Sequence, residues 1–370
     1  MLLLASLCSC GSTEVKEMDS AKEKETAAPI LKVFVENSGS MDGYMKDGSE
    51  LRDAVYALAT AMQGNCADTK LYYVNKETLP YRGDLQSFIR DLTPQAFAKA
   101  GGYRVASDIP EELNRVMKSA NGDTVTMFVS DCMLALPNKV AADWLVNREI
   151  DMTNYVQHAL KTDADFSVIV MKMSSKFDGG FYFNGAHHFK GIRPYFIWLM
   201  GNKYKLARAL KSFDLRESPH NYDQCIAFTQ SAPVHFVATN QYGKSKKLKE
   251  KRGKYHILLR ADLSSTLQPD DVLGNTGSYA TTSDKVVVES VKPVKIKNKF
   301  THTLSVTLDA DGTGGEQYVT LKAPGVLPWV DGVNDAKGGN PLKTIGIKNL
   351  ISGVSKAYKT DLTNMTFIIK

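Results

Sequence analysis

The chain has 370 residues and a mass of 40.8 kDa, and 46 basic against 40 acidic side chains give it a formal net charge of +6. With 43% apolar and 23% charged residues, the composition is that of a globular protein, which excludes disorder, collagen and a coiled coil as the main state. The mildly basic balance does not indicate nucleic-acid binding, and we expect no nucleic-acid partner. The sequence contains no apolar run of 18 residues that could span a membrane.

The first ten residues look like the end of an export signal. They are apolar, and residues 7–10 read LCSC, which resembles a bacterial lipobox whose final cysteine receives lipid and becomes the new N-terminus. No Lys or Arg precedes Cys10, although a signal peptide has a basic segment before its apolar one. We expect a lipid anchor on Cys10 that holds the protein at the outer membrane of the cell envelope, on the periplasmic or surface face. The alternative is a cytoplasmic chain with a fortuitous start.

Composition divides the rest of the chain into three segments. Residues 11–29 are polar with few large apolar groups, so we expect a flexible tether. Residues 30–215 predict alternating strands and helices, which indicates an α/β domain with a doubly wound, mainly parallel sheet. Residues 216–370 predict strands separated by turns, which indicates an antiparallel, β-rich, sandwich-like domain.

The individual elements follow from hydrophobic periodicity. In the α/β segment, strands are expected at residues 31–36, 70–74, 124–130, 166–171 and 194–200, and the main helices at 49–62, 109–119, 140–160 and 203–213. Ser49 and Asp108 are plausible N-caps for two of these helices. In the β-rich segment, strands are expected at residues 234–237, 255–259, 285–289, 302–308 and 318–321, with a late helix at 342–358 and a closing strand at 365–369.

Three polar clusters fall at or near strand ends of the expected parallel sheet. Residues 36–40 follow the first strand, residues 101–108 precede a helix, and Ser130-Asp131 closes the central strand. In doubly wound sheets, ligands collect at the carboxyl ends of the strands. Hydroxyl and carboxylate oxygens that meet in one crevice suit Mg²⁺, Mn²⁺ or Ca²⁺ rather than zinc or copper.

This arrangement resembles a von Willebrand factor A domain with its metal-ion-dependent adhesion site. That family carries Asp-x-Ser-x-Ser after its first strand, a Thr in a later loop and an Asp at the end of a central strand. Ser38 and Ser40 match the two serines, Asp131 matches the distal aspartate, Ser107 stands at the threonine position, and Glu36 stands where the family has its first Asp. The resemblance implies that the three serines ligate a Mg²⁺ ion (or Mn²⁺ or Ca²⁺) and that the two carboxylates hold it through water.

The match departs from the family at two positions. Glu36 is one methylene longer than Asp, so its carboxylate either accommodates the ion or fills the site itself. Ser107 keeps the oxygen of Thr but lacks its methyl group. A plainer interpretation of the same residues is a polar turn at residues 37–40 and a helix cap at Asp131.

The family's usual chemistry is adhesion, in which a carboxylate of a partner protein fills an open position on the metal. We therefore expect a non-enzymatic envelope lipoprotein that binds an unknown protein or envelope ligand through this degenerate site. A metal-assisted hydrolase built on Glu36, Asp42 and Asp131 is the first alternative. A structural lipoprotein with an inactive site is the second. The sequence contains no nucleophile elbow, P-loop, GxGxxG after a strand or HExxH motif.

Three other segments stand out. His187 and His188 are adjacent, so in a strand they point to opposite faces and make a poor chelate. Residues 179–185 predict a hairpin with aromatic side chains that packs against the β-rich domain. Residues 244–254 are strongly basic; we expect a solvated hairpin tip, with contact to anionic lipid or polysaccharide as the alternative.

Overall fold

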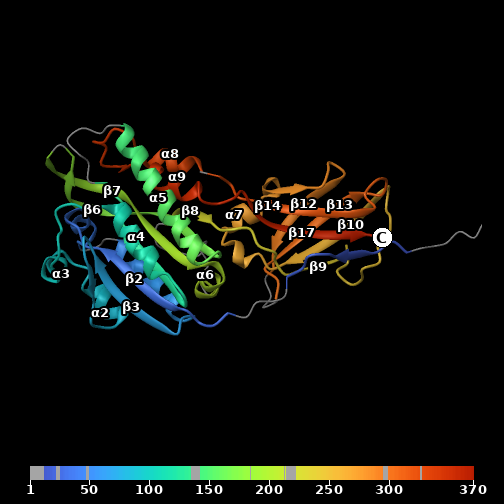
Figure 1. The fold of residues 1–370 in the computed structure, drawn as a ribbon, viewed down its shortest axis with the longest axis horizontal. Coiled ribbons are helices and arrows are strands. Elements are labelled where there is room, and N and C mark those ends of the chain that lie inside the picture. Colours follow the sequence, from blue (N-terminus) through green and yellow to red (C-terminus); the bar gives the residue numbers. More distant parts are fainter. Residues whose placement is uncertain are drawn as a thin grey trace, which may run out of the picture.

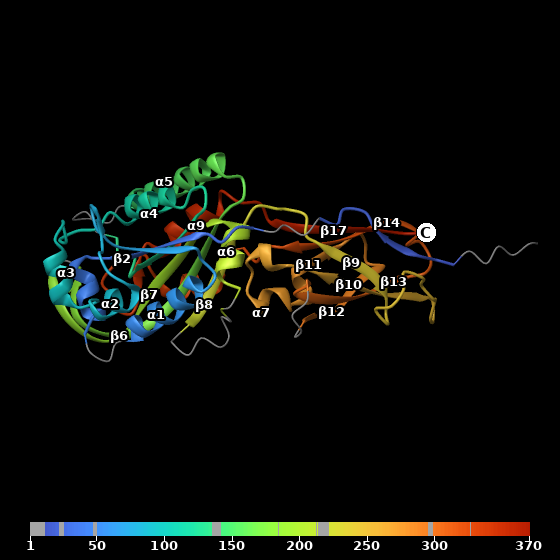
Figure 2. The ribbon, with the colours of Figure 1, turned by 90° about the horizontal axis from the view of Figure 1, so that it is seen from below.

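The structure is a computed structural model that describes residues 12–21, 26–46, 50–134, 142–183, 185–211, 213, 222–294, 299–325 and 327–370. Two units lie end to end along the long axis: a mixed sheet flanked by helices, and a pair of antiparallel sheets (Figures 1 and 2). Cys10, Ser49 and the expected domain boundary at residue 216 lie outside the described residues. In the ranges given above, no helix is both long and apolar enough to cross a membrane.

A seven-stranded sheet forms the centre of the first unit, in the order β4-β3-β2-β5-β7-β6-β8. Only β3, β2 and β5 run parallel to one another, and every other neighbouring pair is antiparallel. The strands are β2 (Ile30–Glu36), β3 (Asp68–Val74), β4 (Thr78–Pro80), β5 (Thr124–Ser130), β6 (Phe166–Tyr182), β7 (Ala186–Asn202) and β8 (Tyr222–Phe228).

The prediction of a doubly wound, mainly parallel sheet is wrong. The strands expected at residues 166–171 and 194–200 are the outer ends of one long hairpin, β6–β7, in which Tyr182 pairs with Ala186 across a short connection. Such a connection forces its strands to run antiparallel, since a parallel pair needs a crossover of a dozen or more residues. The sheet therefore lacks the parallel pattern that the von Willebrand A resemblance implied.

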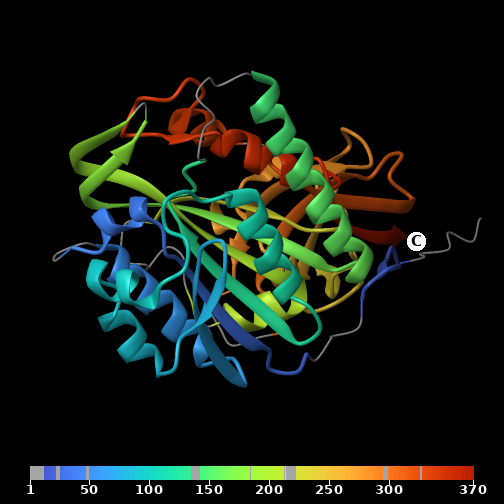
Figure 3. The same ribbon diagram turned by 60° about the vertical axis from the view of Figure 1, so that its left-hand side comes forward.

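Helices cover both faces of this sheet (Figure 3). On one face, α1 buries Leu51, Val55 and Leu58 against apolar side chains of β2, β3 and β5, together with α2, α3 and α6. On the other face, α4, α5, α8 and α9 pack together over side chains of β5, β6 and β7. The helices of this unit are α1 (Glu50–Gln63), α2 (Leu85–Arg90), α3 (Pro94–Ala100), α4 (Ile109–Ser119), α5 (Ala142–Thr162), α6 (Lys203–Ala209), α8 (Pro328–Val333) and α9 (Ile347–Ser355).

The first unit includes segments from the C-terminal half of the chain. Strand β8, which follows residue 216, forms one edge of the seven-stranded sheet. Helices α8 and α9 come after most of the second unit, yet Ile347, Leu350 and Ile351 of α9 are fully buried in the core that α4 and α5 share. The short pair β15 (Asn334–Asp335) and β16 (Thr344–Ile345) frames the loop between these two helices.

The second unit consists of two four-stranded antiparallel sheets, in the orders β1-β17-β14-β11 and β12-β13-β10-β9. Their inner faces share one apolar core, to which Leu259 and Leu304 contribute from one sheet and Val319 and Phe367 from the other. The strands are β1 (Val15–Glu17), β9 (Phe236–Asn240), β10 (Lys254–Ala261), β11 (Tyr279–Thr281), β12 (Val286–Pro293), β13 (His302–Asp309), β14 (Gly315–Lys322) and β17 (Asp361–Ile369), and α7 (Asp270–Leu273) lies near the first unit.

Part of the expected tether is an ordered strand. β1 pairs with the C-terminal strand β17, with Val15 opposite Ile369, and the Val15 side chain is fully buried. A polar segment gains this order because β17 offers it a row of backbone hydrogen-bonding groups and the sandwich core accepts its one large apolar side chain.

Candidate functional site

The loop after β2 is held by a second loop that is distant in sequence. The Arg104 guanidinium donates to Asn37 Oδ1 at 2.8 Å and to Asp42 Oδ1 at 2.5 Å, and the Arg104 carbonyl accepts from the Gly39 N–H at 3.0 Å. These bonds join residues 37–42, which continue into the short helix η1 (Gly39–Tyr44), to the loop that carries Ser107. Two of the three polar clusters expected from the sequence therefore meet.

Glu36 is buried at the centre of this meeting point. Its side-chain oxygens accept hydrogen bonds from Ser107 Oγ at 2.6 Å and from Ser130 Oγ at 2.5 Å. Burial and, to a smaller extent, the negative charge of Asp131 raise the pKa of Glu36 to about 7, against the opposing effect of the serine hydroxyls. The third cluster, at the end of β5, thus reaches the same point.

Asp131 lies on the other side of the serines. Its side chain is fully buried, and Oδ1 accepts from the Met133 N–H at 3.1 Å. Oδ2 has no hydrogen-bond partner among the described residues, and its nearest cation is the buried Arg193, whose Nη1 is 3.8 Å away. Burial raises the pKa of Asp131, although the Arg193 charge and the Ser40 hydroxyl act in the opposite direction.

Ser38 and Ser40 connect the two carboxylates. Their hydroxyl oxygens are 2.9 Å apart; Ser38 also lowers the pKa of Glu36, and Ser40 also lowers that of Asp131. Ser38 is buried, whereas Ser40 is partly exposed, so the cluster opens to solvent at Ser40. The structure brings together all five residues expected from the sequence: Glu36, Ser38, Ser40, Ser107 and Asp131.

Two charged residues of this region were not expected from the sequence. Arg193 is fully buried on β7, where its guanidinium lies over the Phe177 ring, 4.6 Å from the centroid, and donates to the Pro341 carbonyl at 2.8 Å. Glu112 of α4 is 1% exposed, and in the described part of the chain neither of its oxygens has a hydrogen-bond partner. Burial raises the pKa of Glu112 well above its ordinary value, with the charge of Glu36 adding to the effect.

Only one of these two residues leaves a signal in the sequence. Glu112 falls on the apolar face of α4, beside Ile109, Leu113 and Val116, and a charge on that face of an amphipathic helix points to an unusual environment. Arg193 leaves no such signal, because its place depends on the hairpin pairing that puts it opposite Ser175.

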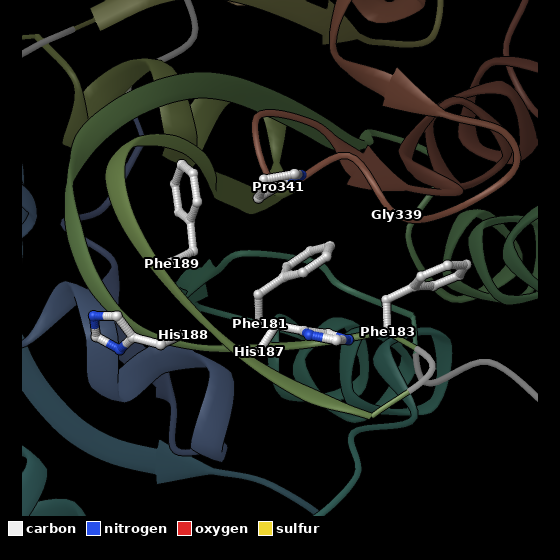
Figure 4. Close-up of a pocket in the computed structure, with 7 residues that line it drawn as sticks. All are labelled: Phe181, Phe183, His187, His188, Phe189, Gly339 and Pro341. Atoms are coloured by element: carbon white, nitrogen blue, oxygen red, sulfur yellow. The ribbon is translucent and has the colours of Figure 1, made fainter.

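An aromatic pocket lies on the concave side of the β6–β7 hairpin (Figure 4). Two of its lining residues contact Arg193, whose guanidinium lies over the Phe181 ring and donates to the Pro341 carbonyl. Its volume is about 300 Å³, and its lining includes Phe181, His187, Phe189 and Pro341. His188 points differently from His187, and its Nε2 is 3.2 Å from Asp178 Oδ1. Near the tip of the hairpin, Phe183 contacts Gly338 and Gly339. These glycines belong to the segment after residue 216, where packing of the hairpin was expected, but they lie in the loop between α8 and α9 of the first unit.

The donor set of the cluster fits a hard divalent cation. Among the described residues, no three or more His, Cys, Asp and Glu side chains are grouped to hold a metal, so an ion here would depend on serine hydroxyls beside two carboxylates. Ser107 donates its proton to Glu36, which leaves its oxygen lone pairs available. Within the described part of the chain, the buried Asp131 Oδ2 atom accepts no hydrogen bond, and a bound cation would offset the cost of burying it in this way.

Comparison of the chain with known protein families, with curated proteins and with solved structures found no match in any of the three.

Proposed function

We propose that this protein is a non-enzymatic binding protein of the cell envelope, anchored by lipid at Cys10, that captures an acidic group of a protein or envelope ligand through a divalent cation. The observation that carries the proposal is the convergence of Ser38, Ser40 and Asp131 around a buried carboxylate oxygen, Oδ2 of Asp131, that accepts no hydrogen bond from any residue the structure describes. A bound cation supplies positive charge and an open coordination position that accepts a carboxylate oxygen of the ligand.

Charge balance supports a cation at this place. Glu36 and Asp131 are two buried carboxylates, and Arg193 is the one cation that forms an ion pair with either of them in the described part of the chain. A buried carboxylate without a full set of hydrogen-bond partners loses more hydration free energy than it regains. Burial therefore disfavours the charged form and raises the pKa of both Glu36 and Asp131. A divalent ion would favour the charged form of both side chains.

The residues of the cluster divide into two roles in this proposal. The atoms that would face the ion are Oδ2 of Asp131 and the hydroxyl oxygens of Ser38, Ser40 and Ser107. Glu36 would orient the hydroxyls, because it accepts hydrogen bonds from Ser107 and Ser130 at once. This is the kind of supporting contact that sets metal affinity in known sites.

The surroundings of the opening suit a macromolecular ligand. Val105, in the loop that carries Ser107, is 84% exposed, and Tyr103 is 42% exposed. Tyr182 of the hairpin is 52% exposed, and its hydroxyl lies beside Gly39. Exposed apolar side chains around a polar centre are typical of interaction surfaces.

Calorimetric titration of the protein with Mg²⁺ and with Mn²⁺ tests the proposal. We expect one saturable site in the natural chain, and affinity at least ~10-fold lower in Ser38→Ala, because that change removes a hydroxyl from the cluster. Ser264→Ala, at an exposed serine of the second unit, is the matched control and should bind as the natural chain does. Absence of a saturable site, or equal affinity in Ser38→Ala and the natural chain, would refute the proposal.

A further inference from the structure

One segment has a net charge equal to that of the whole protein. Residues 244–254, which connect β9 to β10 and end at the first residue of β10, carry seven basic side chains and one glutamate. Their formal charge of +6 equals that of the entire chain. The rest of the molecule is therefore neutral overall. We call residues 244–254 the basic loop.

Most of these charges face solvent without compensation. Lys246 forms an ion pair with Glu17, and Lys254 Nζ lies 3.9 Å from Asp309 Oδ1. Within the ranges that the structure describes, the other basic side chains form no ion pair and are exposed: Lys244, Lys247, Lys249, Lys251 and Arg252. Tyr242, just before the basic loop, is 71% exposed. Aromatic and basic side chains together are typical of surfaces that meet lipid headgroups.

The start of the described chain lies directly against the basic loop. The Leu248 N–H donates to the Thr13 carbonyl at 2.8 Å, and the Val15 N–H donates to the Lys246 carbonyl at 2.9 Å. Glu14 pairs with Lys247 as an isolated β-bridge. The basic loop and β17 thus hold β1 from its two sides, and Leu248 secures the loop because its side chain is buried in the sandwich core.

This contact limits how far the basic loop can lie from the lipid that Cys10 would carry. Cys10 is three residues before Thr13, so the two are at most about 10 Å apart even in an extended chain. The Debye length at physiological ionic strength is about 8 Å, so exposed lysines at this distance feel the charge of the headgroups. We propose that the basic loop is a membrane-contact surface that binds anionic phospholipid headgroups and orients the protein on the bilayer to which it is anchored.

The orientation has a consequence for the candidate site. The basic loop, β1 and the C-terminus lie at one end of the long axis, and the β6–β7 hairpin beside the serine–carboxylate cluster lies at the other (Figure 1). Contact through the basic loop would project the cluster away from the membrane. The inference depends on the lipid anchor of the proposed function for its biological setting, but the loop can be tested without lipid on Cys10 and without metal.

Co-sedimentation with vesicles tests the inference. The full-length Cys10→Ser chain, which cannot carry lipid at residue 10, is mixed at low salt with phosphatidylcholine vesicles that contain or lack phosphatidylglycerol. We expect binding to the anionic vesicles only, with loss of binding as salt is raised. The triple variant Lys247→Gln, Lys249→Gln and Lys251→Gln should bind on the order of 100-fold more weakly, because each lysine near an anionic surface contributes about fivefold in affinity.

The matched control removes the same charge elsewhere. Lys99→Gln, Lys118→Gln and Lys161→Gln alter three exposed lysines of the first unit and should leave vesicle binding within a few fold of the parent chain. Three outcomes would overturn the inference: no binding of the parent chain to anionic vesicles, equal binding to neutral vesicles, or equal losses in the two triple variants. Failure of the metal titration would leave this result unaffected, so the two proposals fail separately.

Discussion

Glu36 and Asp131 are two acidic side chains buried in the same cluster, and their protonation contributes to the stability of the fold. Burial and the Asp131 charge raise the pKa of Glu36 to about 7 in the folded protein, against an ordinary value of 4.5. The folded state therefore binds the proton more tightly than the unfolded chain does. The resulting stabilisation is fully present below about pH 4.5 and is lost as the pH rises through about 7.

Replacing this carboxyl should remove its share of the pH dependence, to which the raised pKa values of Asp131 and Glu112 also contribute. With divalent ions chelated, we expect the free energy of unfolding of the natural chain to fall by on the order of 3 kcal/mol from this group between those two pH values. Glu36→Gln, which keeps the shape and stays neutral, should show a fall that is smaller by about this amount in denaturant titrations at a series of pH values. The exposed Glu77→Gln is the control and should retain the natural dependence. A fall of the same size in Glu36→Gln would contradict the assignment.

At the scale of elements, the long β6–β7 hairpin positions the loop that carries Ser40. The hairpin bends over η1, where Gly179 approaches the backbone of Gly43, and the Tyr44 hydroxyl donates to the Pro194 carbonyl at 2.6 Å. The Tyr44 and Phe177 rings meet edge to face with centroids 4.8 Å apart. The serine loop is thus held between the hairpin and the Arg104 loop.

Adding one methyl group at this contact should loosen the hairpin. A Cβ at Gly179 would lie 2.6 Å from the Gly43 Cα, which forces backbone to move. We expect Gly179→Ala to lower the free energy of unfolding by about 1–3 kcal/mol and to weaken ion binding at the cluster. Gly64→Ala is the control, because its added methyl group would meet no atom closer than 3.7 Å. Unchanged thermal unfolding and unchanged ion affinity in Gly179→Ala would show that the hairpin does not support the site.

At the scale of the whole molecule, the two units are not successive pieces of chain. The sheet of the first unit takes its edge strand β8 from beyond residue 216, and α9 covers α5 with Gly353 in contact with the Glu149 backbone. The chain then returns to the sandwich to form β17. Removing the second half of the sequence would expose a large part of the first unit's apolar core.

A fragment of residues 30–215 should therefore not fold by itself. It lacks β8, α8 and α9, and with them the fully buried side chains of Ile347, Leu350 and Val354. We expect the fragment to lack a cooperative thermal transition and to bind dyes that report exposed apolar surface, whereas residues 12–370 unfold cooperatively. A sharp transition in the fragment would show that the sheet is stable without its C-terminal helices.

Local elements of this protein could be predicted well from its sequence. The helix expected at residues 49–62 is α1 (Glu50–Gln63), the helix at 109–119 is α4 (Ile109–Ser119), and the strand at 31–36 is part of β2 (Ile30–Glu36). Hydrophobic periodicity and capping residues act within one element, so they are readable in a single stretch of chain. The residues of the candidate site could be predicted for the same reason, since Glu36, Ser38 and Asp131 each lie at or just after the end of a strand.

Strand direction, the buried partners of the site and the true course of the chain could not be predicted in this way. The sequence of an apolar strand such as β7 does not show whether its neighbour in the sheet runs parallel or antiparallel to it. The direction is set by the pairing of β6 with β7 in the folded protein. That pairing also places Arg193 beside Asp131, and the return of the chain places α9 on α5. Local sequence patterns were sufficient to predict the main helices and strands and the polar oxygens at strand ends. Which of these oxygens meet depends on the folded protein, because contacts between distant segments depend on the packing of the complete core.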